Sequence, residues 1–192
     1  MARGRPWAVN ALSVKSLELS DNNLRGSIPA AVGSLARLRT LHLTDNELRG
    51  AIPWELGNLA NLRRLRLYKN QLSGAIPAAL GNLPYLQDLS LGGNQLGGSI
   101  PGALGNLAEL RYLGLSYNNL ISEIPSTLGS LRDLRSLHLS NNQLQGEIPR
   151  ELGALSNLKV LNISSNQLSG DIPFELGALA SLEGLNLSNK TG

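Results

Sequence analysis

The chain has 192 residues, of which 42% are hydrophobic and 16% charged, a balance typical of a globular protein that buries a core. It contains no cysteine, which excludes disulfides, thiolate metal sites and thiol catalysis. The net charge of +3 is unevenly spread, with +6 on residues 1–70 and −3 on residues 71–192, a polarity that steers acidic partners toward the N-terminal half. No stretch reaches the roughly 20 consecutive apolar residues of a membrane span, and residues 1–14 lack the apolar run of a signal peptide.

One leucine recurs every 24 residues along the chain, without an insertion or a deletion. The recurring positions are Leu17, Leu41, Leu65, Leu89, Leu113, Leu137, Leu161 and Leu185. The unit reads L-x-L-x-x-N-x-L-x-G-x-I-P-x-x-L-G-x-L-x-x-L-x-x and occurs in seven complete copies. Such a period predicts a solenoid. We expect one domain over 1–192, in which a short cap (1–16) precedes seven repeats (17–184) and an incomplete eighth (185–192).

Each repeat begins with a predicted strand and an asparagine. Leu41, His42 and Leu43 alternate with period two, so the leucines face inward and His42 outward; successive strands stack about 4.8 Å apart into a parallel sheet. An asparagine follows where the chain leaves the strand. Its amide can donate to and accept from the backbone of adjacent coils, as a buried polar group requires. The resulting structural ladder comprises Asn22, Asn46, Asn70, Asn94, Asn118, Asn142 and Asn166.

The second half of each repeat is predicted to be extended and then helical. The residue before Pro53 favours extended backbone, and Pro53 suits the first position of a short helical turn. We expect Gly57 to end that turn with positive φ. In the fifth repeat Ser122 replaces the glycine of the Gly-x-Ile-Pro segment, so positive φ is not expected there. Because the turned side is bulkier, the coils curve with the sheet on the inner arc.

The repeated Gly-x-Ile-Pro signature, first seen at residues 26–29, resembles the plant-type leucine-rich repeat family over residues 14–188. This resemblance implies an α/β solenoid, a horseshoe or superhelical arc with a parallel β-sheet on the concave face and short 3-10 or helical turns on the convex face. It also implies a non-enzymatic scaffold that binds a protein, peptide or glycan through the concave sheet, within a larger receptor-like protein. The segment around Trp7, Ala8 and Ala11 resembles a shortened, cysteine-free N-terminal cap of the family. An extracellular or cell-surface location follows from the resemblance, while the missing cysteines and signal peptide keep a cytoplasmic one open.

A candidate binding patch lies on the outward columns of repeats three to five. All four tyrosines lie between residues 68 and 117, and three of them face outward among charged residues. Gly92, Gly93 and Gly114 leave nearby strand ends bare, so larger side chains border a depression. Tyrosine and arginine around a hollow are typical of binding hot spots. The predicted ligand-binding residues are Arg64, Arg66, Tyr68, Lys69, Asp88, Tyr112 and Tyr117.

Catalytic and metal-binding patterns are missing. There is no phosphate loop, no His-Glu-x-x-His and no Gly-x-Ser-x-Gly, so no enzyme, cofactor or metal is expected. His42 and His138 stand four repeats apart, about 19 Å at sheet spacing, too far to share a metal.

The residue two positions before the first strand leucine is basic in most repeats. This column of side chains suits carboxylate or phosphate ligands but lacks the interleaved aromatics of a nucleic-acid site. It runs Lys15, Arg39, Arg63, Gln87, Arg111, Arg135, Lys159, Glu183.

Three further hypotheses remain open. The chain is alternatively a regulatory segment of an intracellular kinase or GTPase, or an ice-binding protein. Ice binding rests on a hydroxyl row that Tyr68 and Gly92 interrupt: Ser20, Thr44, Ser116, Ser140, Ser164 and Ser188. An uncapped last repeat also predicts end-to-end self-association. Candidate N-glycosylation sites are Asn162, Asn186 and Asn189.

Overall fold

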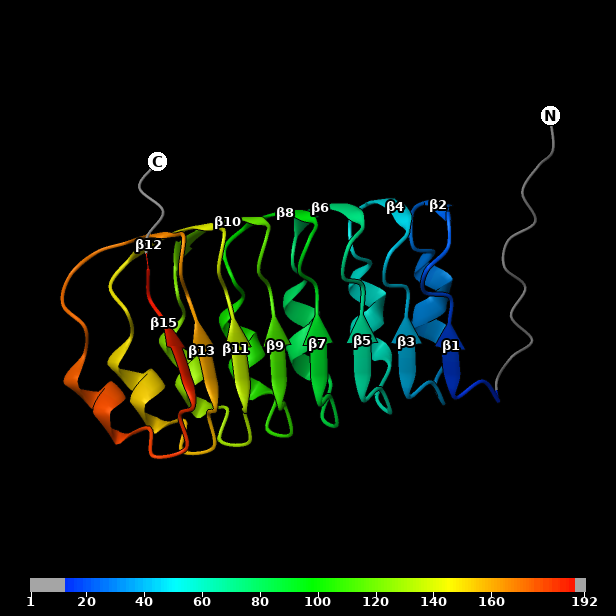
Figure 1. The fold of residues 1–192 in the computed structure, drawn as a ribbon. Helices are drawn as coiled ribbons and strands as arrows, with labels where there is room; N and C mark the ends of the chain where they lie inside the picture. The colour runs from blue at the N-terminus through cyan, green and yellow to red at the C-terminus, as the bar shows by residue number, and fades with distance from the viewer. Residues whose placement is uncertain (1–12, 189–192) are drawn as a thin grey trace.

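The computed structural model describes residues 13–188, so the cap segment around Trp7, Ala8 and Ala11 and the sequon at Asn189 lie outside it. Eight strands pair in parallel, in sequence order, into one long sheet (Figure 1). Equivalent residues face each other, for example Leu41 and Leu65, as the 24-residue period predicts. The strands are β1 (Ser16–Glu18), β3 (Thr40–His42), β5 (Arg64–Arg66), β7 (Asp88–Ser90), β9 (Tyr112–Gly114), β11 (Ser136–His138), β13 (Val160–Asn162) and β15 (Gly184–Asn186).

A second parallel sheet of seven strands follows the asparagine turns. The sequence predicted only extended backbone in this part of each repeat, and strand pairing there is an addition. The glycine before Ile-Pro has positive φ, 78° at Gly50, and Ser122 adopts the same conformation with φ 70°. The expectation for Ser122 was therefore wrong, because strand pairing, in which Ser122 lies opposite Leu144, holds its backbone. The strands are β2 (Arg25–Gly26), β4 (Glu47–Gly50), β6 (Gln71–Ala75), β8 (Gln95–Gly98), β10 (Asn119–Glu123), β12 (Gln143–Gly146) and β14 (Gln167–Leu168).

A five-residue 3-10 helix follows the proline of each Ile-Pro pair, and all seven helices of the described residues are of this type. They are η1 (Ala30–Ser34), η2 (Trp54–Asn58), η3 (Ala78–Asn82), η4 (Gly102–Asn106), η5 (Ser126–Ser130), η6 (Arg150–Ala154) and η7 (Phe174–Ala178). The expectation of positive φ at Gly57 was wrong, because this glycine is not among the left-handed residues. A Cβ on Gly57 would instead clash with the backbone carbonyl of Ala79 in the next coil. The glycine therefore allows adjacent coils to stack closely.

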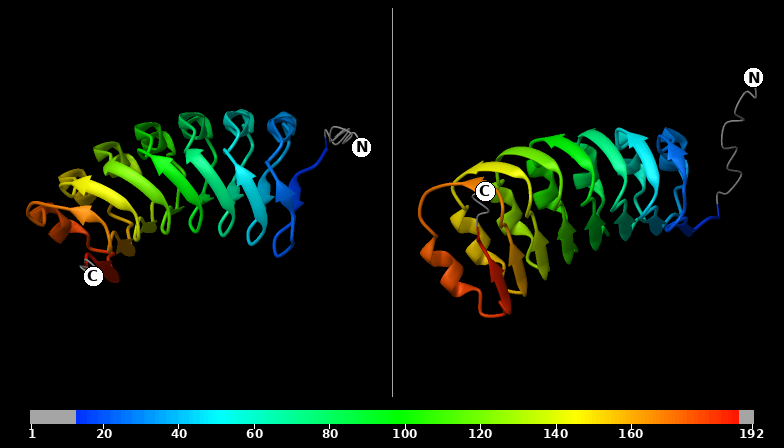
Figure 2. Two further views of the ribbon diagram at one scale, coloured as in Figure 1. Left: turned by 90° about the horizontal axis from the view of Figure 1, so that it is seen from above. Right: turned by 45° about the horizontal axis from the view of Figure 1, so that its top comes forward.

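The core is one continuous leucine cluster that runs the length of the array. The inward leucines of the strands, such as Leu65 and Leu89, are fully buried, whereas Leu185 in the last coil is 50% exposed. The coils form an arc with the eight-stranded sheet on its inner, concave side and the 3-10 helices on its outer, convex side (Figure 2). Among residues 13–188, no helix has the length and apolarity that a bilayer crossing requires.

The asparagine column links successive coils through side-chain to backbone hydrogen bonds. Asn118 Nδ2 donates to the carbonyls of Leu91 and Leu115, both at 3.1 Å, and Asn118 Oδ1 accepts from the Leu96 N–H at 3.0 Å. Asn22 is exposed, and its amide donates only within its own turn, to Leu19 and Ser20. The ladder therefore depends on a preceding coil, which the first asparagine lacks among the described residues.

Candidate ligand-binding face

The concave sheet presents side chains from the strands and from the turns that follow them. Tyr112 projects from β9, where every second residue faces outward. Lys69 and Tyr117 lie in the turns, with left-handed φ values of 52° and 58°. Their N–H groups donate to the next coil, at 3.0 Å to the Gly92 carbonyl and 2.9 Å to the Ser140 carbonyl. The turn backbone therefore fixes where both side chains leave the surface.

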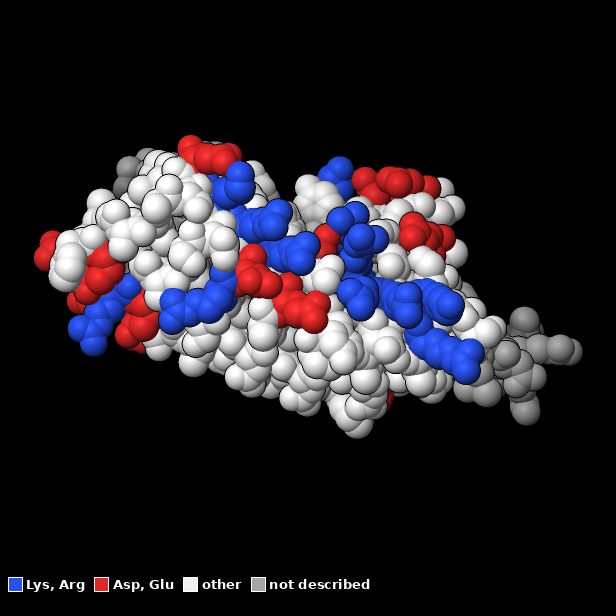
Figure 3. All heavy atoms as spheres, turned by 90° about the horizontal axis from the view of Figure 1, so that it is seen from below, with Lys and Arg blue, Asp and Glu red and all other residues white. Residues whose placement is uncertain are grey.

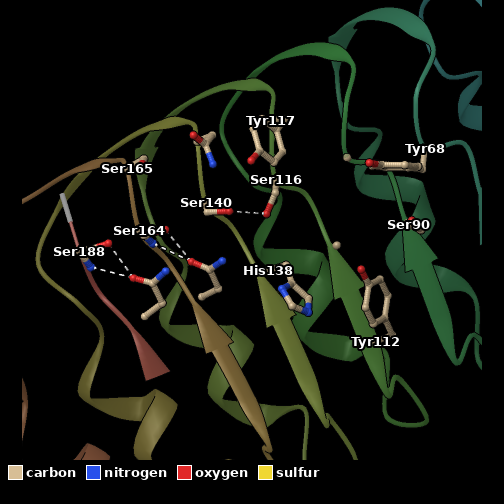
Figure 4. Close-up of a pocket in the computed structure, with 15 residues that line it drawn as sticks. Tyr68, Ser90, Tyr112, Ser116, Tyr117, His138, Ser140, Ser164, Ser165 and Ser188 are labelled. Atoms are coloured by element: carbon tan, nitrogen blue, oxygen red, sulfur yellow. Dashed lines mark hydrogen bonds between the residues drawn. The ribbon is translucent and has the colours of Figure 1, made fainter. Parts of the chain in front are cut away.

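A groove of about 390 Å³ runs along the C-terminal part of this face. The close-up shows its tyrosines toward β7 and β9 and its hydroxyl and amide groups toward β15 (Figure 4). Tyr117 is 62% exposed, and Tyr68 and Tyr112 are 37% and 36% exposed. The residues that line this concave groove are Tyr68, Ser90, Gly92, Tyr112, Gly114, Ser116, Tyr117, His138, Ser140, Asn141, Asn162, Ser164, Ser165, Asn186 and Ser188.

Glycines in the groove make room for two tyrosine rings. A Cβ on Gly114 would lie 2.7 Å from Tyr112 Cε1, and a Cβ on Gly92 would lie 3.3 Å from Tyr68 Cδ2. The rings of Tyr112 and His138 also approach each other, with their centroids 5.4 Å apart and the planes inclined by 39°. Gly92 and Gly114 therefore let the rings lie down against the sheet, so that they form the walls of the groove.

The lining contains no aspartate, glutamate, lysine or arginine. Burial lowers the pKa of His138 below its ordinary value of 6.5, so its imidazole is neutral at pH 7. Burial, followed by the nearby Asp88 carboxylate, raises the pKa of Tyr112 above 10.0, so its phenol stays protonated. The concave groove is therefore uncharged at neutral pH.

The N-terminal part of the same face carries ion pairs. Arg66 contacts Asp88 Oδ2 through Nε at 2.8 Å and through its terminal nitrogen at 2.5 Å. The Asp88 side chain is only 14% exposed, and its Oδ1 is buried without a hydrogen-bond partner among the described residues. Lys69 pairs with Asp45 at 3.3 Å. Arg64 is exposed on β5. We call Arg64, Arg66, Lys69 and Asp88 the charged cluster.

The seven binding residues expected from the sequence thus occupy two adjoining regions. Tyr68, Tyr112 and Tyr117 line the concave groove, and the four residues of the charged cluster lie beside it. Sequence reasoning missed most of the hydroxyl and amide lining, including His138 and Asn141. These residues continue the outward columns into later repeats, and following each column to the last coil would have found them. From the sequence, the serines were named only as a hydroxyl row, and Asn162 and Asn186 only as sequons, because serine and asparagine are common on exposed turns.

The hydroxyl row of the ice-binding hypothesis lies on the curved inner face, and its last four members hydrogen-bond to neighbouring side chains. Ser140 Oγ donates to Ser116 Oγ at 2.9 Å, and Ser164 Oγ donates to Asn162 Oδ1 at 2.7 Å. Asn162 and Asn186, both in sequons, belong to concave strands and line the groove. A glycan on Asn162 would therefore occupy the groove itself.

The basic column forms one edge of the molecule. Lys15, Arg37, Arg39 and Asn61 surround a shallow hollow of about 250 Å³, and Figure 3 shows basic side chains gathered over the N-terminal repeats. Toward the other end, Lys159 pairs with Glu183 at 2.6 Å. Among the described residues, no group of three or more His, Cys, Asp or Glu is arranged to hold a metal ion.

Family models match most of the chain. A leucine-rich repeat region model covers residues 92–192, and two leucine-rich repeat models cover residues 60–120 and residues 13–35 with 37–59. Comparison with curated proteins gives no match.

Solved structures of plant receptors share the fold. The ectodomain of the Arabidopsis receptor kinase HAESA, in complex with an extended IDA peptide hormone, is 40% identical over 92% of this chain, with a TM-score of 0.88. The plant peptide hormone receptor RGFR1, in complex with RGF2, is 38% identical over 89% of the chain (TM-score 0.87), and a TDR receptor is 38% identical over 91% (TM-score 0.90). The chain spans only 30%, 28% and 30% of these three structures, respectively. The matching repeats, the two parallel sheets and these likenesses agree, and the chain belongs to the plant-type leucine-rich repeat family.

Proposed function

We propose that this chain, with residues 1–192 acting as one domain, is a non-catalytic recognition module of a receptor-like protein that binds a protein, peptide or glycan through its concave sheet. The observation that carries the proposal is the concave groove, which gathers three exposed tyrosines and a dense set of hydrogen-bonding groups on one face. Rigid elements present all of them, and a groove with aromatic walls is typical of a binding site.

The likeness to receptors solved with peptide hormones supports ligand binding by this fold. The charged cluster beside the groove adds a polar rim, and such rims commonly surround the centre of an interface. The lining has no carboxylate or lysine, and the hydrogen bonds that its serine hydroxyls donate go to Ser116 and to asparagine oxygens and not to His138. Without a serine bonded to a base among the described residues, the geometry supports a binding role over a catalytic one.

The test is a ligand screen followed by mapping. The purified chain is panned against a displayed random peptide library and against a printed glycan array, and every ligand found is then titrated against two variants. Tyr112→Ala alters the concave face, and Trp54→Ala alters an aromatic residue, 60% exposed, of the convex helix η2. We expect Tyr112→Ala to weaken binding at least about tenfold and Trp54→Ala to change it by less than about twofold. Ligands that respond only to Trp54→Ala, or the absence of any ligand in both screens, would refute the proposal.

A further inference from the structure

The concave groove offers a ligand nothing to pair with a charge. Its lining consists only of tyrosine, serine, asparagine, glycine and a neutral histidine. A carboxylate or ammonium group entering it would lose hydration without gaining a counter-charge, which is costly. Arg66 and Asp88 pair with each other through Asp88 Oδ2, and neither residue lines the groove. The groove therefore favours an uncharged ligand.

The groove also lacks an aliphatic pocket. None of its lining residues is Leu, Ile, Val, Met or Phe, whereas peptide ligands usually bind through large side chains that fill apolar pockets. Hydrogen-bonding groups dominate instead, and they repeat with the coils, as in Ser116, Ser140 and Ser164. Their spacing of about 4.8 Å is close to the length of one sugar unit in an extended chain. This pattern suits a ligand with hydroxyl groups along its whole length.

Several of these groups are oriented in advance. Asn162 Oδ1 accepts hydrogen bonds from the backbone N–H of Ser164 at 3.2 Å and from its hydroxyl at 2.7 Å. This arrangement leaves the Asn162 amide nitrogen without a hydrogen-bond partner among the described residues, as a donor facing the groove. The ring nitrogens of the uncharged His138 supply one donor and one acceptor. Oriented donors lower the entropic cost of binding a polyhydroxyl ligand.

Aromatic rings complete the arrangement. Tyr68, Tyr112 and Tyr117 expose part of their rings at one end of the groove, and the electron-rich face of an aromatic ring attracts the C–H groups of a sugar. Tyr117 is held at φ 58°, a conformation that Gly93 adopts in the preceding coil with φ 61°. Glycine takes this conformation without strain and tyrosine does not. The equivalent residue is left-handed in every described coil, so a fixed turn presents the Tyr117 ring at the groove.

From these observations we infer that the concave groove binds a neutral oligosaccharide, whose sugar faces stack on the tyrosines and whose hydroxyl groups bond to the serine and asparagine columns. This inference rests on the proposed function, because it names the ligand class of the same face. A peptide ligand is the competing outcome.

The experiment titrates the full chain with cellohexaose and xylohexaose as neutral probes and with a galacturonate hexamer as a charged probe. We expect at least one neutral hexamer to bind, with an affinity that changes less than about twofold between about 50 mM and 500 mM NaCl, since no ion pair forms. Tyr117→Gly removes the ring and relieves the left-handed strain, so it lowers the affinity about tenfold or more while the melting temperature stays level or rises. Asp21→Gly is the matched control, because Asp21 occupies the same backbone column with φ 57° but lies in the first repeat and does not line the groove; it leaves the affinity within about twofold.

Two results overturn the inference: neither neutral hexamer binds, whether or not the galacturonate hexamer does, or Asp21→Gly weakens sugar binding as much as Tyr117→Gly. Panning the same protein with the peptide library separates this failure from that of the proposed function. Peptides that bind the concave face without any sugar binding overturn the oligosaccharide and leave the recognition role standing. Failure of sugars, other glycans and peptides together overturns both.

Discussion

From β1 to β7 the concave sheet carries Glu18, Arg64, Arg66 and Asp88. From β9 to β15 its outward positions carry tyrosine, histidine, serine, asparagine, valine and glycine, and no aspartate, glutamate, lysine or arginine. The backbone beneath is the same in both halves, with the same register from coil to coil. The inward leucines are equally buried in both, 0% exposed at Leu65 and at Leu137. The inward columns of the repeat therefore stabilise the fold, and the outward columns are left to bind a ligand.

This separation means that the scaffold has the same energetic requirements in both halves, while ligand contacts differ between them. A substitution in an inward column should have one effect wherever it is made. A substitution in an outward column should depend on the half in which it lies.

The largest expected effect comes from the glycines that allow coils to stack. A Cβ at Gly57 or at Gly105 would clash with a backbone carbonyl of the next coil, at Ala79 or Thr127, and backbone cannot move aside cheaply. We expect Gly57→Ala and Gly105→Ala each to lower the free energy of unfolding by about 3 kcal/mol, as measured by urea denaturation.

The matched control for these variants is Gly177→Ala, in the same column of the last repeat. A Cβ there has no atom within 4 Å, so we expect a change of less than about 1 kcal/mol, of either sign. An equal loss at Gly177 and Gly105 would show that the stacking of coils is not what requires the glycine.

The asparagine ladder should give the next largest effect, again in both halves. Asn70 Oδ1 accepts a hydrogen bond from the Leu48 N–H at 3.0 Å, and Asn142 Oδ1 accepts one from the Leu120 N–H. Asn70→Ala and Asn142→Ala therefore each leave a buried N–H without its partner. Each variant should lose about 2 to 3 kcal/mol of stability in urea denaturation. Asn22→Ala removes only exposed local hydrogen bonds and should cost less than about 1 kcal/mol. Equal losses at all three positions would contradict the ladder.

The period of the repeat made most of this scaffold predictable. Leucine spacing indicates the sheet, its register and its curvature, because a strict period gives each coil the same neighbours. The errors arose where one residue type serves two purposes. Glycine permits either positive φ or close approach, and the sequence alone did not show that Gly57 serves the second. At Ser122 strand pairing overrides the local preference of a residue with a Cβ, which a single repeat does not reveal.

The candidate site was less predictable than the scaffold. The columns show which residues face outward, and they led to the tyrosines. They do not show that Tyr112 lies down over Gly114 or that Arg66 turns toward Asp88, because both depend on side-chain rotamers. Those two choices divide the face into an uncharged groove and a charged cluster, a division that the sequence analysis did not make.

A smaller effect is expected from the ion pair in the charged half. Arg66→Ala leaves the Asp88 carboxylate, 14% exposed, without its cation, and should cost about 1 kcal/mol of stability, since Arg66 itself is partly solvated. In the double variant with Asp88→Asn, most of this loss should be recovered. A double-mutant cycle by urea denaturation measures the coupling, and strictly additive losses would show that the pair contributes nothing to the fold.

The smallest predicted effect is a pH dependence in the uncharged half. Burial lowers the pKa of His138 below 6.5, so the unfolded chain binds a proton at a higher pH than the folded chain does. The stability contribution of this histidine is therefore fully present above pH 6.5 and is lost progressively as the pH falls below it. Urea denaturation at about pH 7 and pH 5 should show a smaller loss for His138→Gln than for the unaltered chain; an identical loss would remove His138 as its source. Protonation of His138 also places a positive charge in the concave groove, so that at low pH both halves of the concave sheet are charged. Binding of a neutral ligand should therefore weaken over the same pH range.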